Sequence, residues 1–112
     1  MDNGVITSFE PATGALLWQG TPGDPDRVLT LARRAFPEWA AQPLAIRIEL
    51  IRRFANEVRK QAEPLAECIA RETGKPLWEA RDEVQSVIGK VEISVRAYAE
   101  RTGQRAIWRT IM

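Results

Sequence analysis

The sequence predicts a small, mainly α-helical domain that begins with a short β-hairpin. Apolar residues recur at spacings of three and four over long segments of the chain, as on one face of an α-helix. Residues 5–9 and 15–19 are instead rich in β-branched and aromatic side chains, which is typical of strands. The length of 112 residues is that of one domain.

The hairpin is expected to pair residues 5–9 with residues 15–19 across a turn. Pro11 and Gly14 lie between the two strands, where proline fixes one backbone angle and glycine permits a positive one. Because an isolated two-stranded hairpin is marginally stable, we expect this one to lie against another part of the molecule.

The first helix is expected to begin at Pro25, with Asp24 as its N-cap residue. Proline in a helix interior lacks a hydrogen-bond donor and clashes with the preceding turn, so Pro37 predicts that this helix ends or kinks near Phe36. The apolar stripe of the helix consists of Val28, Leu31, Ala35, Phe36 and Trp39.

A second helix is expected from Pro43 onward, and Pro64 predicts a kink or a fresh helix further along. Gly74 is expected to end that helical segment, with Pro76 just beyond it. The apolar face of this region comprises Ile48, Ile51, Phe54, Ala55, Val58, Leu65, Ala66 and Ile69. Four arginines are expected mainly on the other face of the second helix, namely Arg47, Arg52, Arg53 and Arg59.

The last helix is expected to be the longest, roughly six turns, and to end at Gly103. Its stripe favours packing in a core over a free coiled coil, and it consists of Leu77, Val84, Ile88, Val91, Val95 and Tyr98. Residues 104–112 show no such period. We therefore predict a hairpin-and-helix unit over residues 1–103 and a divergent or truncated tail over residues 104–112.

Composition excludes several classes of function. The net charge of +1 provides no field that would gather nucleic acid or anionic lipid. The chain has no histidine and one cysteine, which excludes histidine-dependent triads, histidine metal ligands, an internal disulfide and a CxxC zinc site. No signal peptide and no apolar stretch of roughly 20 residues is present, so a cytoplasmic protein without a membrane partner is expected.

The candidate reactive residues each have a simpler structural interpretation. Cys68 lies inside an expected helix beside Glu67, whose charge disfavours a thiolate, so we interpret it as a structural or semi-buried thiol. Gly74 and Lys75 are similar to the end of a phosphate-binding loop, but Ile69 and Pro76 stand at the positions where GxxxxGK[ST] requires glycine and a hydroxyl residue.

The charged and aromatic groups are likewise interpreted as structural. The acidic residues Glu79, Asp82 and Glu83 fall at the start of the last helix, where they complement the helix dipole. The arginine pairs at 33–34 and 52–53 are interleaved with acids and read as solvated surface, while Trp39 and Trp78 are expected to be core or interface anchors. No GxGxxG fingerprint occurs. We therefore assign no catalytic, cofactor-binding or metal-binding residue.

Taken in order, several segments resemble the N-terminal part of the aldehyde dehydrogenase superfamily. The resemblance covers residues 5–103 and is carried by the order and spacing of its segments. They are FEPATG at 9–14 leading to LWQG at 17–20, ARRAFPEWA at 32–40, Arg47 with IRRFA at 51–55, and ETGKPLWEA at 72–80. Residues 90–103 look most like the succinylglutamate-semialdehyde dehydrogenases of arginine catabolism.

The resemblance implies a partial α/β fold without the Rossmann sheet and catalytic domain of the family. Such enzymes use NAD or NADP: a cysteine thiolate attacks the aldehyde, a hydride passes to the nicotinamide, and a glutamate-activated water releases the acid. The family's catalytic cysteine, glutamate, oxyanion asparagine and cofactor loop are expected beyond residue 112, and Cys68 matches none of their motifs. We therefore expect a truncated member or fragment that is inactive alone and holds no cofactor.

The predicted helices leave three apolar stripes without the sheet that would cover them. We therefore expect a loosely packed monomer or a self-associating helical assembly. The alternative hypothesis is a stand-alone helical interaction module that pairs with a full-length homologue. A small nucleic-acid binder is disfavoured by the net charge of +1.

Overall fold

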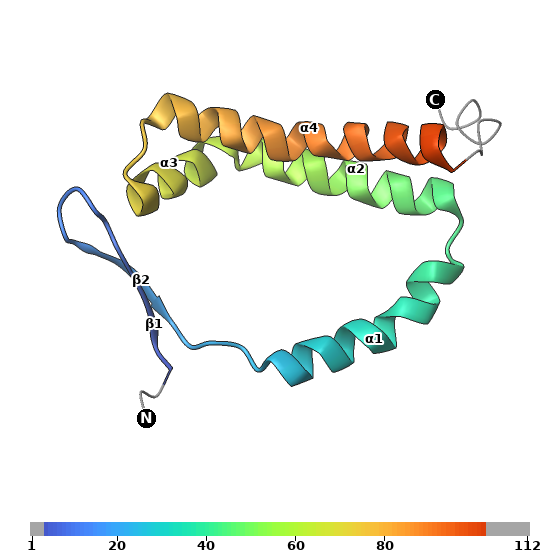
Figure 1. Cartoon of the computed structure of the whole chain (residues 1–112), viewed down its shortest axis with the longest axis horizontal. Helices are drawn as coiled ribbons and strands as arrows, with labels where there is room; N and C mark the ends of the chain where they lie inside the picture. The colour runs from blue at the N-terminus through green and yellow to red at the C-terminus, as the bar shows by residue number, and fades with distance from the viewer. Residues whose placement is uncertain (1–3, 103–112) are drawn as a thin grey trace.

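The computed structural model describes residues 4–102, which form a two-stranded hairpin followed by four helices (Figure 1). The mainly helical fold with an antiparallel hairpin is the one that the sequence predicts. The strands are β1 (Ile6–Phe9) and β2 (Leu16–Gly20), and the helices are α1 (Pro25–Ala41), α2 (Leu44–Lys60), α3 (Ala62–Thr73) and α4 (Leu77–Arg101).

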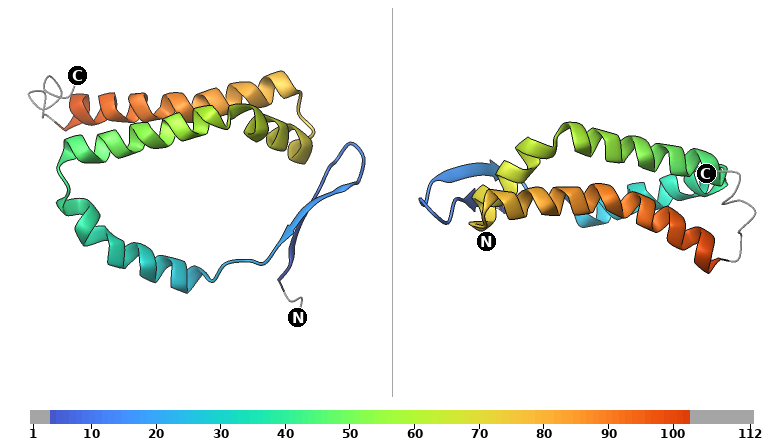
Figure 2. Two further views of the ribbon diagram at one scale, coloured as in Figure 1. Left: turned by 180° about the vertical axis from the view of Figure 1, so that it is seen from behind. Right: turned by 90° about the horizontal axis from the view of Figure 1, so that it is seen from above.

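The elements form an open ring rather than a closed bundle. Helices α2 and α3 run along α4, whereas α1 lies on the opposite side of the ring and reaches the hairpin through an extended segment (Figures 1 and 2). The radius of gyration is 18.6 Å, well above the roughly 13 Å of a compact domain of this length. Helix α1 therefore has few packing contacts with the rest of the described chain.

The core lies along one side of α4. Ala66 and Ala80 are fully buried, and these small side chains let α3 and α4 approach closely where the two helices meet. No residue of α1 is buried. The buried residues of the core are Ile48 and Ala55 from α2, Ala66 from α3, and Ala80, Val84, Ile88, Val91, Val95 and Ala99 from α4.

The hairpin confirms the predicted pairing. Its strands are antiparallel, with Thr7 opposite Gln19 and Ser8 opposite Trp18, and the register shifts between Ser8 and Phe9. Gly14 adopts a φ of +74° in the turn, a conformation that a side chain would disfavour.

The start of α1 is confirmed, and of the two outcomes expected near Phe36, an end or a kink, the end is wrong. The Asp24 carboxylate accepts hydrogen bonds from the backbone N–H groups of Asp26 at 3.0 Å and Arg27 at 3.4 Å. The helix continues through Pro37 to Ala41, and its ribbon bends as it approaches α2 (Figure 1). Because every residue of α1 before Gln42 is exposed, water can satisfy the carbonyl that loses its partner at Pro37.

The other predicted breaks are also confirmed. Helix α2 ends at Lys60 and α3 begins at Ala62, so Pro64 lies in a first turn, where its missing N–H has no partner to lose. Gly74 has a φ of +78° and its N–H donates to the carbonyl of Ala70 at 2.9 Å, as in an αL helix cap. The expected end at Gly103 and the tail at 104–112 lie outside the described residues.

Several large apolar side chains assigned to packed faces are exposed instead. Phe54 on α2 is 58% exposed, and Trp78 on α4 is 65% exposed, so a core role for Trp78 is wrong. Trp39 is also exposed. The sequence period identifies the apolar face of each helix, whereas burial additionally requires a neighbouring element, and the described residues supply neighbours mainly along one side of α4.

Candidate functional site

Cys68 is an exposed thiol on α3, so the expected semi-buried position is wrong. It borders a shallow surface hollow with Trp18 of the hairpin and Arg71 of its own helix. The chain contains no histidine that could act as its base. Cys68 therefore has no histidine that could take its proton and activate it as a nucleophile.

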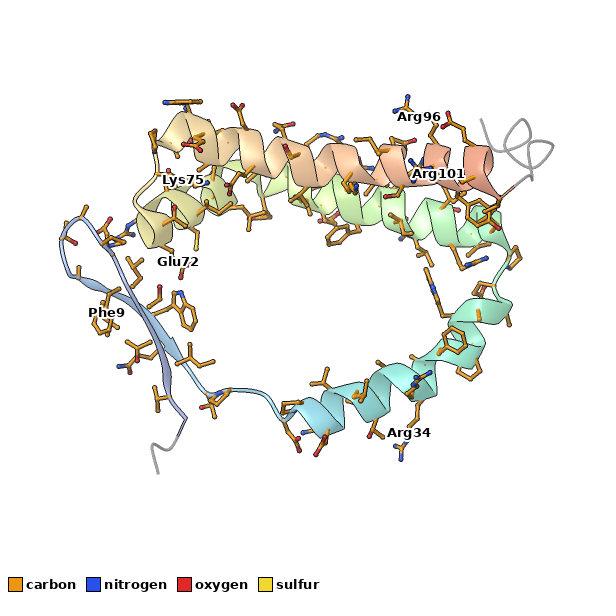
Figure 3. The ribbon with its side chains drawn as sticks, in the orientation of Figure 1. Phe9, Arg34, Glu72, Lys75, Arg96 and Arg101 are labelled. Carbon is orange, nitrogen blue, oxygen red and sulfur yellow. The ribbon has the colours of Figure 1, made fainter. Side chains whose placement is uncertain are left out.

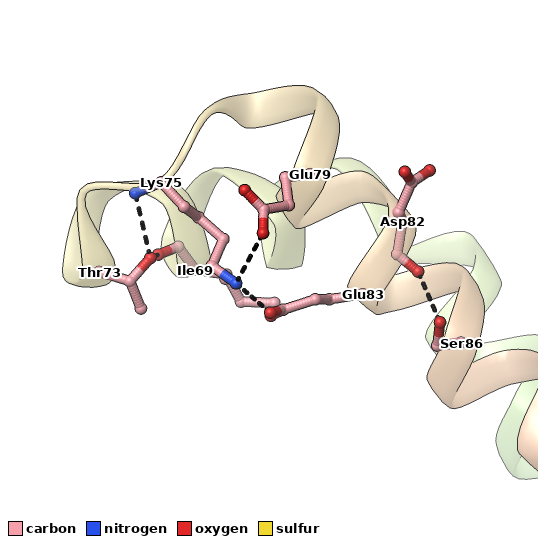
Figure 4. A network of polar contacts seen from close by, with 7 residues as sticks. All are labelled: Ile69, Thr73, Lys75, Glu79, Asp82, Glu83 and Ser86. Carbon is pink, nitrogen blue, oxygen red and sulfur yellow. Dashed lines mark hydrogen bonds and ion pairs between the residues drawn. The ribbon is translucent and has the colours of Figure 1, made fainter.

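Two of the three acidic residues at the start of α4, Glu79 and Glu83, pair with Lys75, as Figure 4 shows. The Lys75 ammonium binds the Glu83 carboxylate and lies 3.9 Å from the Glu79 carboxylate, and the hydrogen bond with Glu83 raises the pKa of Lys75. The backbone N–H of Lys75 donates to Thr73 Oγ1 at 3.4 Å. The predicted solvated helix start is confirmed, and the described residues contain no group of three side chains suited to hold a metal ion.

Two arginines tie helices together across the surface. Arg52 of α2 donates to both carboxylate oxygens of Glu92 on α4, at 2.7 and 3.1 Å, and this pairing raises the pKa of Arg52 and lowers that of Glu92. Arg81 of α4 binds Glu63 of α3 in the same two-pronged way. Arg52 therefore links α2 to α4, whereas the sequence predicted only a solvated surface charge.

The hairpin is held to α3 by polar contacts around Glu72, which Figure 3 places at the end of α3 beside the hairpin. The Glu72 carboxylate accepts hydrogen bonds from Ser8 Oγ at 2.7 Å and from the indole N–H of Trp18. Arg71 adds an ion pair with Glu10, with Nε and Oε1 3.2 Å apart. These contacts confirm that the hairpin lies against another part of the chain.

Acidification is expected to release the hairpin from α3. Hydrogen bonds from Ser8 and Trp18 lower the pKa of Glu72, so their contribution is present at neutral pH and is lost as the pH falls through the folded-state value. The indole N–H resonance of Trp18, assigned with Trp18→Phe, should shift toward its solvent-exposed position on acidification. Glu72→Gln should show that position already at neutral pH, whereas the control Glu67→Gln should not. Equal Trp18 resonances in the two variants would show that Glu72 does not hold the hairpin to α3.

A groove of about 210 Å³ opens between α2 and α4, and Trp39 of α1 also lines it. Arg47 lines it, although this residue belongs to the four arginines that the sequence places mainly on the polar face of α2. Its Nε atom is buried and has no hydrogen-bond acceptor within the described part of the chain. The spacing of Leu44, Arg47, Ile48 and Ile51 would have revealed a charge within the apolar stripe. The groove residues are Trp39, Leu44, Arg47, Ile48, Ile51, Val91, Ser94, Val95 and Tyr98.

A second surface feature is the apolar face of α1. Phe36 is 59% exposed and Leu31 is 52% exposed, and by helical spacing these two residues lie at the two edges of the apolar stripe of the helix. Soluble monomers rarely expose large continuous apolar patches, which usually mark interaction sites. The large apolar residues of α1 that are exposed are Val28, Leu29, Leu31, Phe36 and Trp39.

The surface thus carries an exposed apolar face on α1 and a largely apolar groove between α2 and α4. The sequence model of the aldehyde dehydrogenase family matches residues 2–110. The chain belongs to the aldehyde dehydrogenase family. This assignment confirms the resemblance found in the sequence.

Among curated proteins, this aldehyde dehydrogenase chain is similar to enzymes named N-succinylglutamate 5-semialdehyde dehydrogenase. It is 66% identical to that of Novosphingobium aromaticivorans over 107 residues, which is 96% of this chain and 23% of the relative. It is 60% identical to that of Sphingopyxis alaskensis over 102 residues, 91% of this chain and 21% of the relative. It is 52% identical to that of Paraburkholderia xenovorans over 104 residues, 90% and 21% respectively.

The chain thus spans about a fifth of the length of these curated relatives. In the described part of this aldehyde dehydrogenase chain, no helix has the length and apolar character needed to cross a membrane.

Proposed function

We propose that this chain is the N-terminal segment of an NAD(P)-dependent aldehyde dehydrogenase that oxidises N-succinylglutamate 5-semialdehyde to its carboxylate. The observation that carries the proposal is the 66% identity over 107 residues to an enzyme of that name. The proposal extends to a cytoplasmic place in arginine catabolism, which the sequence resemblance implies. Within the enzyme, the segment supplies docking faces, and the reacting groups belong to the rest of the protein.

The α2–α4 groove does not fit the nicotinamide cofactor. The α2–α4 groove measures about 210 Å³ and is largely apolar, below the range of about 300–1,000 Å³ that is usual for ligand pockets. The sequence also lacks a glycine-rich turn that could receive a pyrophosphate. We therefore derive no step of the reaction through NAD(P) on this chain, and we expect the isolated chain to be inactive.

A chimeric enzyme tests the proposal. The matching segment of the Novosphingobium aromaticivorans relative is replaced by this chain, and aldehyde-dependent NAD(P)H formation is measured at 340 nm. We expect the chimeric enzyme to keep the parent's activity within roughly tenfold, because substitutions away from packed or paired groups usually have small effects. The chain alone should give none. Failure of the chimeric enzyme to fold, alongside an active parent, would contradict the proposal.

The exposed apolar face of α1 also supports a second function, that of a helical interaction module. In this alternative the chain associates with itself or with a full-length homologue, because α1 buries none of its own residues. Sedimentation of the chain alone and with the intact relative distinguishes the two functions. A saturable complex with the intact enzyme favours the module, whereas binding only to an enzyme that lacks the matching segment favours the fragment.

A further inference from the structure

We propose that the α2–α4 groove receives an apolar segment from the rest of the aldehyde dehydrogenase chain, and that a carboxylate on this segment pairs with Arg47. This inference rests on the proposed function, because it names the contact by which the segment docks onto the enzyme.

Arg47 brings to the groove a buried hydrogen-bond donor without a partner among the described residues. Its Nε atom is buried without an acceptor in the described part of the chain. A buried donor that lacks a partner is destabilising, and a buried charge is normally paired. The guanidinium presents its donors as a planar fork that matches a carboxylate. Arg47 is therefore placed to receive an acceptor that the described residues do not provide.

The rest of the groove fits an apolar chain segment. Leu44, Ile48 and Ile51 line it from α2, and Val91 and Val95 line it from α4. Its volume of about 210 Å³ accommodates one or two side chains rather than a whole secondary-structure element. An apolar side chain next to an acidic one would fill the groove and complete the bonding of Arg47.

Charge complementarity indicates where the acid comes from. None of the residues that line the groove is acidic, and Glu92 of α4 is already bonded to Arg52. Residues 103–112 contain neither aspartate nor glutamate. The curated relatives have more than four times the length of the matched segment, so the remainder of the family chain is the source that we infer.

The test compares substitutions at Arg47 in the chimeric enzyme with the same substitutions in the chain alone. Arg47→Met keeps the aliphatic length but removes the guanidinium, and Arg47→Lys keeps the charge without the fork. The matched control is Arg53→Met, since Arg53 is an exposed arginine on the same helix outside this groove. The readouts are the melting temperature of each protein and a crystal structure of the chimeric enzyme.

We expect Arg47→Met to lower the melting temperature of the chimeric enzyme by several degrees, Arg47→Lys to recover part of the loss, and Arg53→Met to leave it unchanged. In the chain alone, Arg47→Met should raise the melting temperature, because it removes an unpaired buried donor. An arginine with a purely internal structural role would shift both proteins in the same direction. The crystal structure should place a carboxylate oxygen from beyond the matched segment within about 3.2 Å of Arg47 Nε.

The possible failures are distinguishable. A chimeric enzyme that folds and is active, but responds equally to Arg47→Met and Arg53→Met, overturns the docking contact and leaves the proposed function intact. A backbone carbonyl, a water molecule or a free carboxylate from the buffer at Arg47 overturns it as well. A chimeric enzyme that does not fold even with Arg47 present contradicts the proposed function and the docking contact together.

Discussion

Replacing Ala80 by leucine is expected to lower the free energy of unfolding of the chain by about 2–3 kcal/mol. Ala80 is fully buried and belongs to the same core cluster as the fully buried Ala66 of α3. Leucine adds three carbon atoms at a contact that has no room for them, so α3 and α4 must separate or adopt strained rotamers. Urea denaturation followed by circular dichroism at 222 nm measures the change.

The matched control for this substitution is Ala45→Leu. Ala45 is exposed on α2, and alanine and leucine have similar helix propensities, so the expected change is within about 0.5 kcal/mol. If both variants unfold at the same urea concentration, α3 and α4 are not closely packed at Ala66 and Ala80.

The breaks between elements could be predicted because their signals are local. Asp24 caps its own helix within three residues, Pro64 falls in a first turn, and Gly74 needs a positive φ that few other residues tolerate. Pro37 predicted an end or a kink, and the end was wrong because the cost of a proline depends on its surroundings. An exposed helix can leave one carbonyl to water, and the local sequence does not show that α1 is exposed.

Burial and pairing could not be predicted, because both depend on which elements meet. Trp39 and Phe54 have the spacing of packed residues and Trp78 is expected to be an anchor, yet all three side chains are exposed. Arg47 shows the converse, since a residue expected on the polar face contributes a buried atom to a groove. The family resemblance covered nearly all the segments concerned, but a motif records residue order and not the neighbours of each side chain.

The second large effect is expected from two glutamates on the apolar face of α1. In the chain alone, Leu31→Glu with Phe36→Glu should change the free energy of unfolding by less than about 0.5 kcal/mol, because α1 buries no residue. In the chimeric enzyme the same variant should fail to fold or melt far below the parent. Fully burying each apolar side chain is worth about 1.5–3 kcal/mol, and a buried unpaired carboxylate adds a further penalty.

The control variant adds the same charge to the opposite side of the helix. Thr30→Glu with Ala41→Glu also introduces two glutamates at exposed positions, and by helical spacing these lie opposite the centre of the apolar stripe that Leu31 and Phe36 border. It should leave both proteins unchanged. If the Leu31 and Phe36 variant of the chimeric enzyme fails to fold and the control variant folds, the apolar face of α1 is the docking face. The two variants have the same net charge and a similar helix propensity, so neither property can explain the difference. If the chain alone instead self-associates and the Leu31 and Phe36 variant dissociates it, α1 is an interface between copies, which favours the interaction module over the enzyme segment.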